Sequence, residues 1–296
     1  MKAIAAYKYY DAQTVEEAIA VLNQYGGKAK ALAGGTDLVD WMKRRFMPTP
    51  EVLVNIKNIP SIKGITEEGG ALKIGATTTL TDIIENSTVQ SKYKSLAEAA
   101  MKGPAPGIRN MATIAGNLCQ YVRCWYYRWP DWYCYRKGGP ICFATGGKNM
   151  PHAIMEQKVC NAVVASDLAT PLSAMNATLT VQGTGGTREV AVKDLYIVLG
   201  TVLKPDEIIT SVNVPEAPSK QTFMKSRVRN AIDFALVSAA AATTSKGTMV
   251  ALGGVAPIMV AGTPDTVNAA IDKATPLSEN RYKVSVAKAM VKRVTA

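Results

Sequence analysis

The five cysteines of this chain all fall within one stretch, and this clustering limits what the surrounding fold can be. They are Cys119, Cys124, Cys134, Cys142 and Cys160, and three of the four tryptophans lie among them. An odd number of thiols in a chain of 296 residues does not suit a disulfide scaffold, which is typical of much shorter secreted domains. The pattern favours reduced thiols that bind a metal or a cluster.

The spacing of the cysteines does not identify the metal. The stretch contains neither the C-x-x-C pairs of a zinc ribbon nor the closely spaced run of a bacterial ferredoxin. The residues alone therefore leave zinc and iron–sulfur equally open. His152, the only histidine, lies in the same stretch. A lone histidine is more often a hydrogen-bonding residue than a ligand, so we do not include it among the expected ligands.

The charge of the chain favours an anionic ligand or an acidic partner. Thirty-four basic residues against 23 acidic ones give a net charge of +11, but the basic residues are scattered, which argues against a nucleic-acid module. No apolar run reaches the ~18 residues that a membrane helix needs, and the first residues turn polar too soon for a signal-peptide core. We therefore expect a cytoplasmic chain without a membrane span.

Hydrophobic spacing predicts a small alternating α/β unit over residues 1–58. Thr14 lies three residues before Glu17, which is typical of a helix start, and the helix should stop at the glycine pair 26–27. A strand over 28–33, a second helix after the next glycine pair, and a strand over 51–56 follow.

A second unit is expected over residues 59–215, and a third over 219–296. The second unit has strand patterns at 71–80, 177–183 and 188–196, with helices near 81–86 and 91–101. Two prolines suggest a linker over 213–221. The third unit combines strand patterns with an amphipathic helix over 279–294.

Two glycine loops offer backbone amides to a phosphate. In "ALAGGTDL", Gly34 and Gly35 leave no Cβ between the backbone and a ligand, and Thr36 adds a hydroxyl group. In "ATIAGNL", Thr113, Gly116 and Asn117 provide the same kinds of group. Each loop alone is a weak signal, because a glycine pair between a strand and a helix is often a plain turn. Neither matches the usual nucleotide-binding motifs.

Taken together, "AGGTDL", "TIAGNL", "SDLATPL" and "FMKSRVRNAIDFALVSAA" resemble the flavin-binding subunit of the molybdenum hydroxylases. The resemblance spans nearly the whole chain, with the motifs in order. It implies an α+β fold: an FAD-binding domain of two α/β subdomains, of the vanillyl-alcohol-oxidase (PCMH-like) type, and a C-terminal α+β domain. The subdomains would be residues 1–58 and 59–215, and the C-terminal domain residues 219–296.

The resemblance also implies the residues that bind FAD. The pyrophosphate and ribityl chain would be wrapped by Lys30, Ala31, Leu32, Ala33, Gly34, Gly35, Thr36, Asp37 and Leu38. The second phosphate loop would consist of Ala112, Thr113, Gly116 and Asn117. The isoalloxazine and its surroundings would be contacted by Cys119, Ser166, Asp167, Leu203 and Lys225. A cation such as Lys225 near the flavin would stabilise an anionic reduced ring.

The cysteine loop, residues 119–160, is similar to an inserted loop in the β subunit of 4-hydroxybenzoyl-CoA reductase and in a few aldehyde oxidoreductases. In those proteins the loop binds a 4Fe–4S cluster. The resemblance implies that the ligands are Cys124, Cys134, Cys142 and Cys160. Cys119 would remain beside the flavin, and the aromatic residues of the loop would exclude water from the cluster.

The resemblance implies an oxidoreductase subunit that transfers electrons and has no catalytic residue of its own. Substrate chemistry would occur at a molybdopterin in a large subunit, and a small 2Fe–2S subunit would pass electrons to FAD. The cluster would connect this chain to a ferredoxin-like carrier. The alternative is a zinc-stabilised nucleotide-binding or regulatory module without a redox role. The substrate, the direction of electron flow and any use of NAD lie outside this sequence, and co-export with a partner would place the chain in the periplasm.

Overall fold

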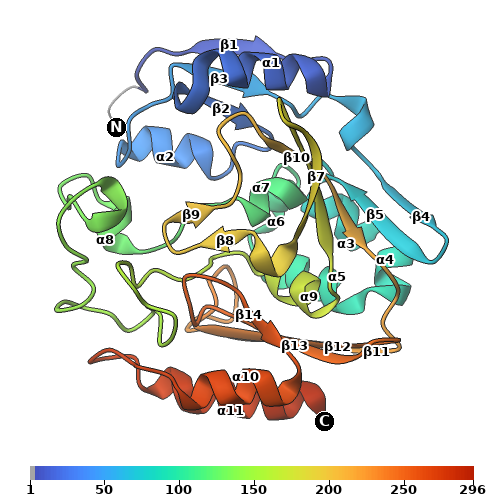
Figure 1. Ribbon diagram of the computed structural model, residues 1–296, viewed down its shortest axis with the longest axis vertical. Coiled ribbons are helices and arrows are strands. Elements are labelled where there is room, and N and C mark those ends of the chain that lie inside the picture. Colours follow the sequence, from blue (N-terminus) through green and yellow to red (C-terminus); the bar gives the residue numbers. More distant parts are fainter. Residues whose placement is uncertain (1–3) are drawn as a thin grey trace.

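The computed structural model describes residues 4–296 and begins with a parallel sheet of three strands (Figure 1). In spatial order its strands are β1 (Lys8–Asp11), β3 (Val52–Asn55) and β2 (Ala29–Leu32). The helices of this layer are α1 (Val15–Tyr25) and α2 (Leu38–Arg44). The expected order of helix, strand, helix and strand is confirmed, and β1 precedes it as a strand that the sequence did not predict.

The ends of α1 lie where the sequence predicts them. The hydroxyl group of Thr14 accepts a hydrogen bond from the backbone N–H of Glu17 at 3.1 Å, which satisfies one of the free donors of the first turn. At the other end, Gly26 has a φ of 52°, a left-handed value that glycine adopts without steric cost. The helix buries Val15, Ala18 and Leu22. A local cap, a glycine stop and an apolar stripe are together sufficient to define it.

A five-stranded antiparallel sheet forms the second layer. Its strands in spatial order are β4 (Ile65–Glu68), β5 (Ala71–Gly75), β10 (Ile208–Val214), β6 (Thr178–Gly183) and β7 (Gly186–Ala191). The helices of this part are α3 (Leu80–Glu85), α4 (Ser87–Lys92), α5 (Lys94–Lys102), α6 (Pro106–Arg109), α7 (Ile114–Leu118) and α9 (Ala169–Ala174). A two-stranded ribbon is formed by β8 (Tyr196–Ile197) and β9 (Gly200–Thr201).

Two local expectations for this layer need correction. The helix expected over 91–101 is α5, which begins only at Lys94; a separate helix that the sequence did not predict, α4, precedes it, and the two are separated at Tyr93, a residue with a φ of −128°. The linker expected over 213–221 is shorter, because its first two residues belong to β10 and its last two to β11. The prolines interrupt the chain only between these strands, where no ladder hydrogen bond is needed.

The third layer is a four-stranded antiparallel sheet covered by two helices on one face (Figure 1). Its strands in spatial order are β11 (Lys220–Ser226), β12 (Val237–Thr244), β13 (Gly247–Gly253) and β14 (Val260–Gly262). The helices are α10 (Pro264–Asp272) and α11 (Tyr282–Thr295). Residues of α11 such as Ala287 and Val291 pack with Val237 and Leu252 in an apolar core of their own.

The cysteine loop lies at the side of the molecule, between α2 and the C-terminal layer (Figure 1). Apart from α8 (Trp125–Arg128) and a 3₁₀ turn at Tyr135–Lys137, it has no regular structure among the described residues. A small apolar cluster supports it, made of Trp41, Phe46, Val122, Tyr127, Cys134, Cys160 and Ala162. Within residues 4–296, no helix is both long enough and apolar enough to span a bilayer.

The burial of Ile74 in the main core leads to a prediction about shortening this side chain. Ile74 is fully buried and pairs with Val212 of the neighbouring strand, whereas Lys73 beside it is exposed. Ile74→Ala should lower the free energy of unfolding by ~2–5 kcal/mol, because it removes buried methyl groups and leaves a cavity. Urea unfolding followed by circular dichroism measures the change. Lys73→Ala is the matched control, and an equal loss in both variants would contradict this packing.

Candidate functional site

The first glycine loop connects β2 to α2 and is only partly buried. Gly35 has a φ of 71°, which explains why a glycine occupies this position. All residues from Lys30 to Leu38 are partly or fully exposed, although most of them are small or apolar. Burial lowers the pKa of Lys30 below its ordinary value. The loop therefore presents backbone and small side chains at a surface that an anionic ligand can reach.

The second glycine loop lies directly against the first. A Cβ atom added at Gly34 would lie 1.9 Å from the carbonyl oxygen of Met111 and 3.0 Å from Cα of Ala112, so only glycine allows this approach. Thr113 begins α7, and its hydroxyl group accepts a hydrogen bond from the N–H of Gly116 at 3.2 Å. Gly116 is exposed, whereas Ala112 and Thr113 are buried. Two loops that are far apart in sequence thus form one glycine-rich surface.

Asn117 and Ser166 lie next to this surface and are bonded to each other. The hydroxyl group of Ser166 donates to Oδ1 of Asn117 at 2.7 Å and accepts from the N–H of Ala169 at 3.2 Å. The hydroxyl group of Tyr196 donates to the carbonyl of Leu118 at 3.0 Å, and burial raises the pKa of this tyrosine. The structure therefore brings the expected site residues Asn117 and Ser166 together, and Tyr196 adds a contact that the sequence did not indicate.

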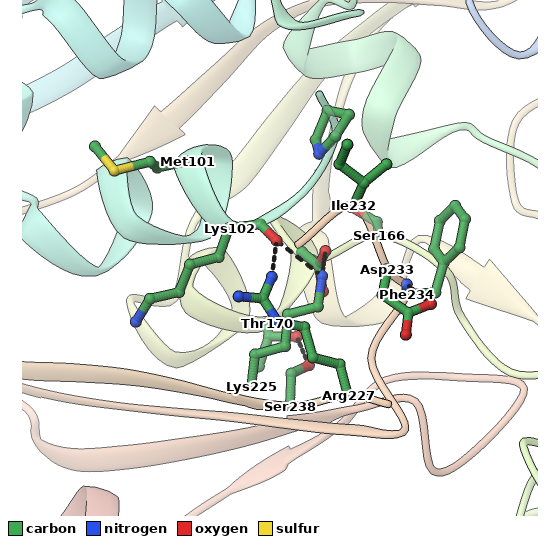
Figure 2. A network of polar contacts seen from close by, with 12 residues as sticks. Met101, Lys102, Ser166, Thr170, Lys225, Arg227, Ile232, Asp233, Phe234 and Ser238 are labelled. Carbon is green, nitrogen blue, oxygen red and sulfur yellow. Dashed lines mark hydrogen bonds and ion pairs between the residues drawn. The ribbon is translucent and has the colours of Figure 1, made fainter. Parts of the chain in front are cut away.

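Asp167 and Lys225 form a buried ion pair in which Lys225 Nζ lies 2.6 Å from Oδ2 of Asp167. Figure 2 shows Lys225 and Arg227 converging on the carbonyl oxygen of Lys102, at 3.1 Å and 3.0 Å. Burial raises the pKa of Asp167, and the charge of Lys225 opposes that shift. The family resemblance predicts that Lys225 lies near the flavin as a cation. Here its charge is balanced by Asp167, so the pair adds no net charge to the site.

A small cavity connects these residues to the start of the cysteine loop. Its lining includes Ser166, Asp167, Arg123 and Phe234. The guanidinium carbon of Arg123 lies 4.6 Å from the centre of the Phe234 ring, a cation–π contact. Leu203 is partly buried and packs against the main core.

Asp37, at the end of the first glycine loop, joins this loop to the cysteine loop. Its carboxylate accepts from the N–H of Tyr121 at 2.8 Å and forms ion pairs with Arg123 at 2.9 Å and Arg128 at 3.2 Å. Arg128 also reaches Asp40, at 2.9 Å. Burial lowers the pKa of Arg123 to about 10, still well above neutrality. Asp37 is one of the residues expected at the FAD. Its side chain instead joins the first glycine loop to the cysteine loop.

Four of the five cysteines line one cavity inside the cysteine loop. Cys124, Cys134, Cys142 and Cys160 contribute to its wall, together with aromatic residues such as Tyr127 and Phe143. Cys119 is not part of this wall. It caps α7 and packs against the main core, where burial raises its pKa to about 12. The structure therefore separates the thiols into the same two groups, four and one, that the resemblance implied.

Polar donors point at three of the four sulfurs. His152 Nε2 lies 3.2 Å from Sγ of Cys124, Asn161 Nδ2 lies 3.3 Å from Sγ of Cys142, and the N–H of Ala162 lies 3.5 Å from Sγ of Cys160. Within residues 4–296, no three side chains of the His, Cys, Asp or Glu type are close enough together to hold a metal ion. The four cysteines therefore share one cavity wall without the close grouping that a single metal ion needs.

Several residues at these sites were not singled out from the sequence. Arg123 and Arg128 are among them, and the only signal in the sequence is that both lie within four positions of Cys124. His152 was set aside as a lone histidine, although it lies among the cysteines. Burial lowers its pKa to about 4, so the ring is neutral at neutral pH.

Comparison with known proteins identifies the family of this chain. Residues 5–217 match the family described as the FAD binding domain in molybdopterin dehydrogenase. The chain is 32% identical to the aldehyde oxidoreductase FAD-binding subunit of Escherichia coli K12, with 98% of each chain covered. It is 28% identical to the carbon monoxide dehydrogenase medium chain of Afipia carboxidovorans, covering 88% of this chain and 76% of that one.

A solved structure shows the same arrangement of layers. Carbon monoxide dehydrogenase from Hydrogenophaga pseudoflava superimposes with a TM-score of 0.74 at 27% identity, covering 99% of this chain and 96% of the other. The likeness therefore includes the C-terminal layer, which lies beyond the matched family region. With the family region covering most of the sequence and the fold shared from end to end, this chain belongs to the FAD-binding domains of the molybdopterin dehydrogenases and is an FAD-binding oxidoreductase subunit of the molybdenum hydroxylases.

Proposed function

We propose that this chain transfers electrons through two groups, an FAD held on the joined glycine loops and a 4Fe–4S cluster held by the cysteine loop. The observation that carries the proposal is the arrangement of the cysteines. Four thiols that are distant in sequence line one cavity, and the fifth lies apart from it. When bound, the two groups would supply one- and two-electron redox chemistry that no side chain of this protein offers.

The glycine loops fit the phosphates of FAD. Gly34 brings the backbone of the two loops into contact, and a Cβ at Gly35 or Gly116 would lie within 3.3 Å of neighbouring side chains. Backbone N–H groups that end a strand or begin a helix bind phosphate oxygens well. Residues 30–38 with Ala112, Thr113, Gly116 and Asn117 would hold the pyrophosphate and ribityl chain.

The remaining FAD contacts would lie beside the small cavity. Cys119, Ser166, Asp167, Leu203 and Lys225 would surround the ring system on this proposal. The Asp167–Lys225 pair would contribute as a fixed dipole with directed hydrogen-bonding groups, because its charges balance. Residues 1–58 and 59–215 would be the two FAD-binding subdomains, and 219–296 the C-terminal domain.

The cysteine cavity fits a cluster better than a single zinc ion. A zinc ion needs its four ligands on one point at ~2.3 Å, whereas a 4Fe–4S cluster binds each thiolate at a different iron. The four cysteines line one cavity without the close grouping that a single ion needs, and three of their sulfurs lie within 3.5 Å of a hydrogen-bonding group. Donors directed at sulfur are typical of the protein environment of iron–sulfur clusters. The zinc-stabilised alternative has no comparable support.

The proposed function requires partner subunits that carry the molybdopterin and the 2Fe–2S groups. The relatives are named as a subunit and a medium chain, so those proteins work within larger enzymes. We propose that a large subunit carries the molybdopterin and that a small 2Fe–2S subunit passes electrons to the FAD. A ferredoxin-like carrier would contact the cysteine loop, where Trp129, Tyr133 and Ile141 are more than half exposed. The net charge of +11 favours an acidic carrier.

A first prediction concerns FAD. Gly116→Val and Gly34→Ala should each release the cofactor, the first by pressing a branched side chain against the Thr113 hydroxyl group of the second loop and the second by forcing the loops apart. Flavin absorbance per protein measures occupancy, and circular dichroism checks the fold. Gly107→Ala is the matched control, because the space around Gly107 is open. Full occupancy in both test variants would remove the basis for this site.

A second prediction concerns metal. Serine at Cys124, Cys134, Cys142 or Cys160 should abolish the iron signal, because each variant removes one ligand from the cavity wall. Cys119→Ser should keep it, since that thiol lies outside the cavity. Metal analysis together with visible absorption distinguishes iron from zinc. Iron that persists in all four cavity variants, or a stoichiometric zinc ion in the native protein, would refute the cluster.

A third prediction tests the subunit assignment. The isolated chain should reduce artificial dyes when given a chemical electron donor, yet it should not convert an aldehyde, a purine or an aromatic acyl-CoA. Turnover should appear only when the molybdopterin and 2Fe–2S subunits are added, because the oxygen chemistry needs the metal centre they supply. Substrate turnover by the lone chain would instead point to a self-contained flavoenzyme.

A further inference from the structure

The half of the cysteine loop that carries His152 is fastened to the C-terminal layer by buried polar contacts. Lys283, on α11, is fully buried and donates to the carbonyls of Pro151 at 3.0 Å, His152 at 2.9 Å and Gly254. Asn280, also fully buried, donates to the carbonyl of His152 at 3.1 Å. Two side chains, one just before α11 and one in its first turn, thus both hold the backbone carbonyl of His152.

The side chain of His152 points away from this anchor and toward Cys124. Its ring is 2% exposed and makes an edge-on contact with Trp125, with centroids 5.4 Å apart. Nε2 lies 3.2 Å from the Cys124 sulfur, while Nδ1 has no hydrogen-bond partner. Among the described residues, the ring of His152 therefore makes its one hydrogen-bonding contact with the sulfur of a proposed ligand.

The chemistry of the contact decides which atom donates. A thiolate that binds iron carries no proton, so the hydrogen between the two atoms must belong to the imidazole. Asn161 presents the same case, because its Nδ2 amide group can only donate to Cys142. Hydrogen bonds to the sulfur ligands stabilise the reduced, more negative state of an iron–sulfur cluster and raise its potential.

We propose that His152 and Asn161 are tuning residues that raise the reduction potential of the cluster through hydrogen bonds to Cys124 and Cys142, and that Lys283 and Asn280 hold His152 in the required position. The proposal rests on the proposed function, because it assumes that the four cysteines bind a 4Fe–4S cluster. It gives the C-terminal layer a part in electron transfer. That layer otherwise contributes no wall to the cysteine cavity.

The test compares potentials in the full-length, cofactor-loaded protein. His152→Phe keeps an aromatic ring for the contact with Trp125 but removes the donor, and Asn161→Leu removes the second donor. Gln157→Leu is the matched control. Gln157 lies in the same loop, and its side chain donates hydrogen bonds to the backbone carbonyls of Ala153 and Thr275 and not to a cysteine sulfur. Potentiometric titration followed by electron paramagnetic resonance gives the midpoint, and metal analysis gives the iron content.

We expect His152→Phe and Asn161→Leu to shift the midpoint to more negative values with unchanged iron, while Gln157→Leu stays at the native value. His152→Gln, which restores an N–H donor, should recover part of the shift. Native midpoints in both donor variants would overturn the proposal. It would equally fail if both variants lost iron while the control kept it, because the side chains would then only support the loop. Absence of iron from the native protein would instead refute the proposed function itself.

Discussion

A carboxylate shared by two guanidinium groups holds the two halves of this site together. Asp37 ends the first glycine loop, and Arg123 and Arg128 belong to the cysteine loop. All three side chains are largely buried, and taking such charges out of water costs several kcal/mol per ion. The arrangement therefore contributes more to the unique placement of the two loops than to net stability. If the carboxylate were removed, two buried cations would lose a partner, and the cysteine loop would lose its fixed position relative to the glycine loops.

Local signals predicted much of the fold. The Thr14 cap, the glycine stop at Gly26 and the strand patterns of the first unit act over a few residues, so the sequence displays them directly. The same holds for β12, β13 and α11. The break between α4 and α5 was missed because both segments have helical composition, and only the buried position of Tyr93 shows where the chain turns.

The sequence indicates which residues belong to the candidate site, but it does not show which other residues they contact. A motif can mark Lys225 as belonging to a flavin-binding chain, yet it cannot show that Asp167 lies 2.6 Å away and balances the charge. Asp37 likewise stood in a ligand-binding motif while its partners lay 84 and more positions further along the sequence. His152 had no helical or strand pattern around it. Its role depends on Asn280 and Lys283, which reach it only after the chain has folded back.

The position of Lys283 also has a consequence for how the protein is made. The cysteine loop is synthesised well before α11, and domains generally begin to fold in the order in which they leave the ribosome. Until α11 emerges, the carbonyls of Pro151, His152 and Gly254 lack the ammonium group that satisfies them. The loop can therefore reach its final shape only after α11 has been translated.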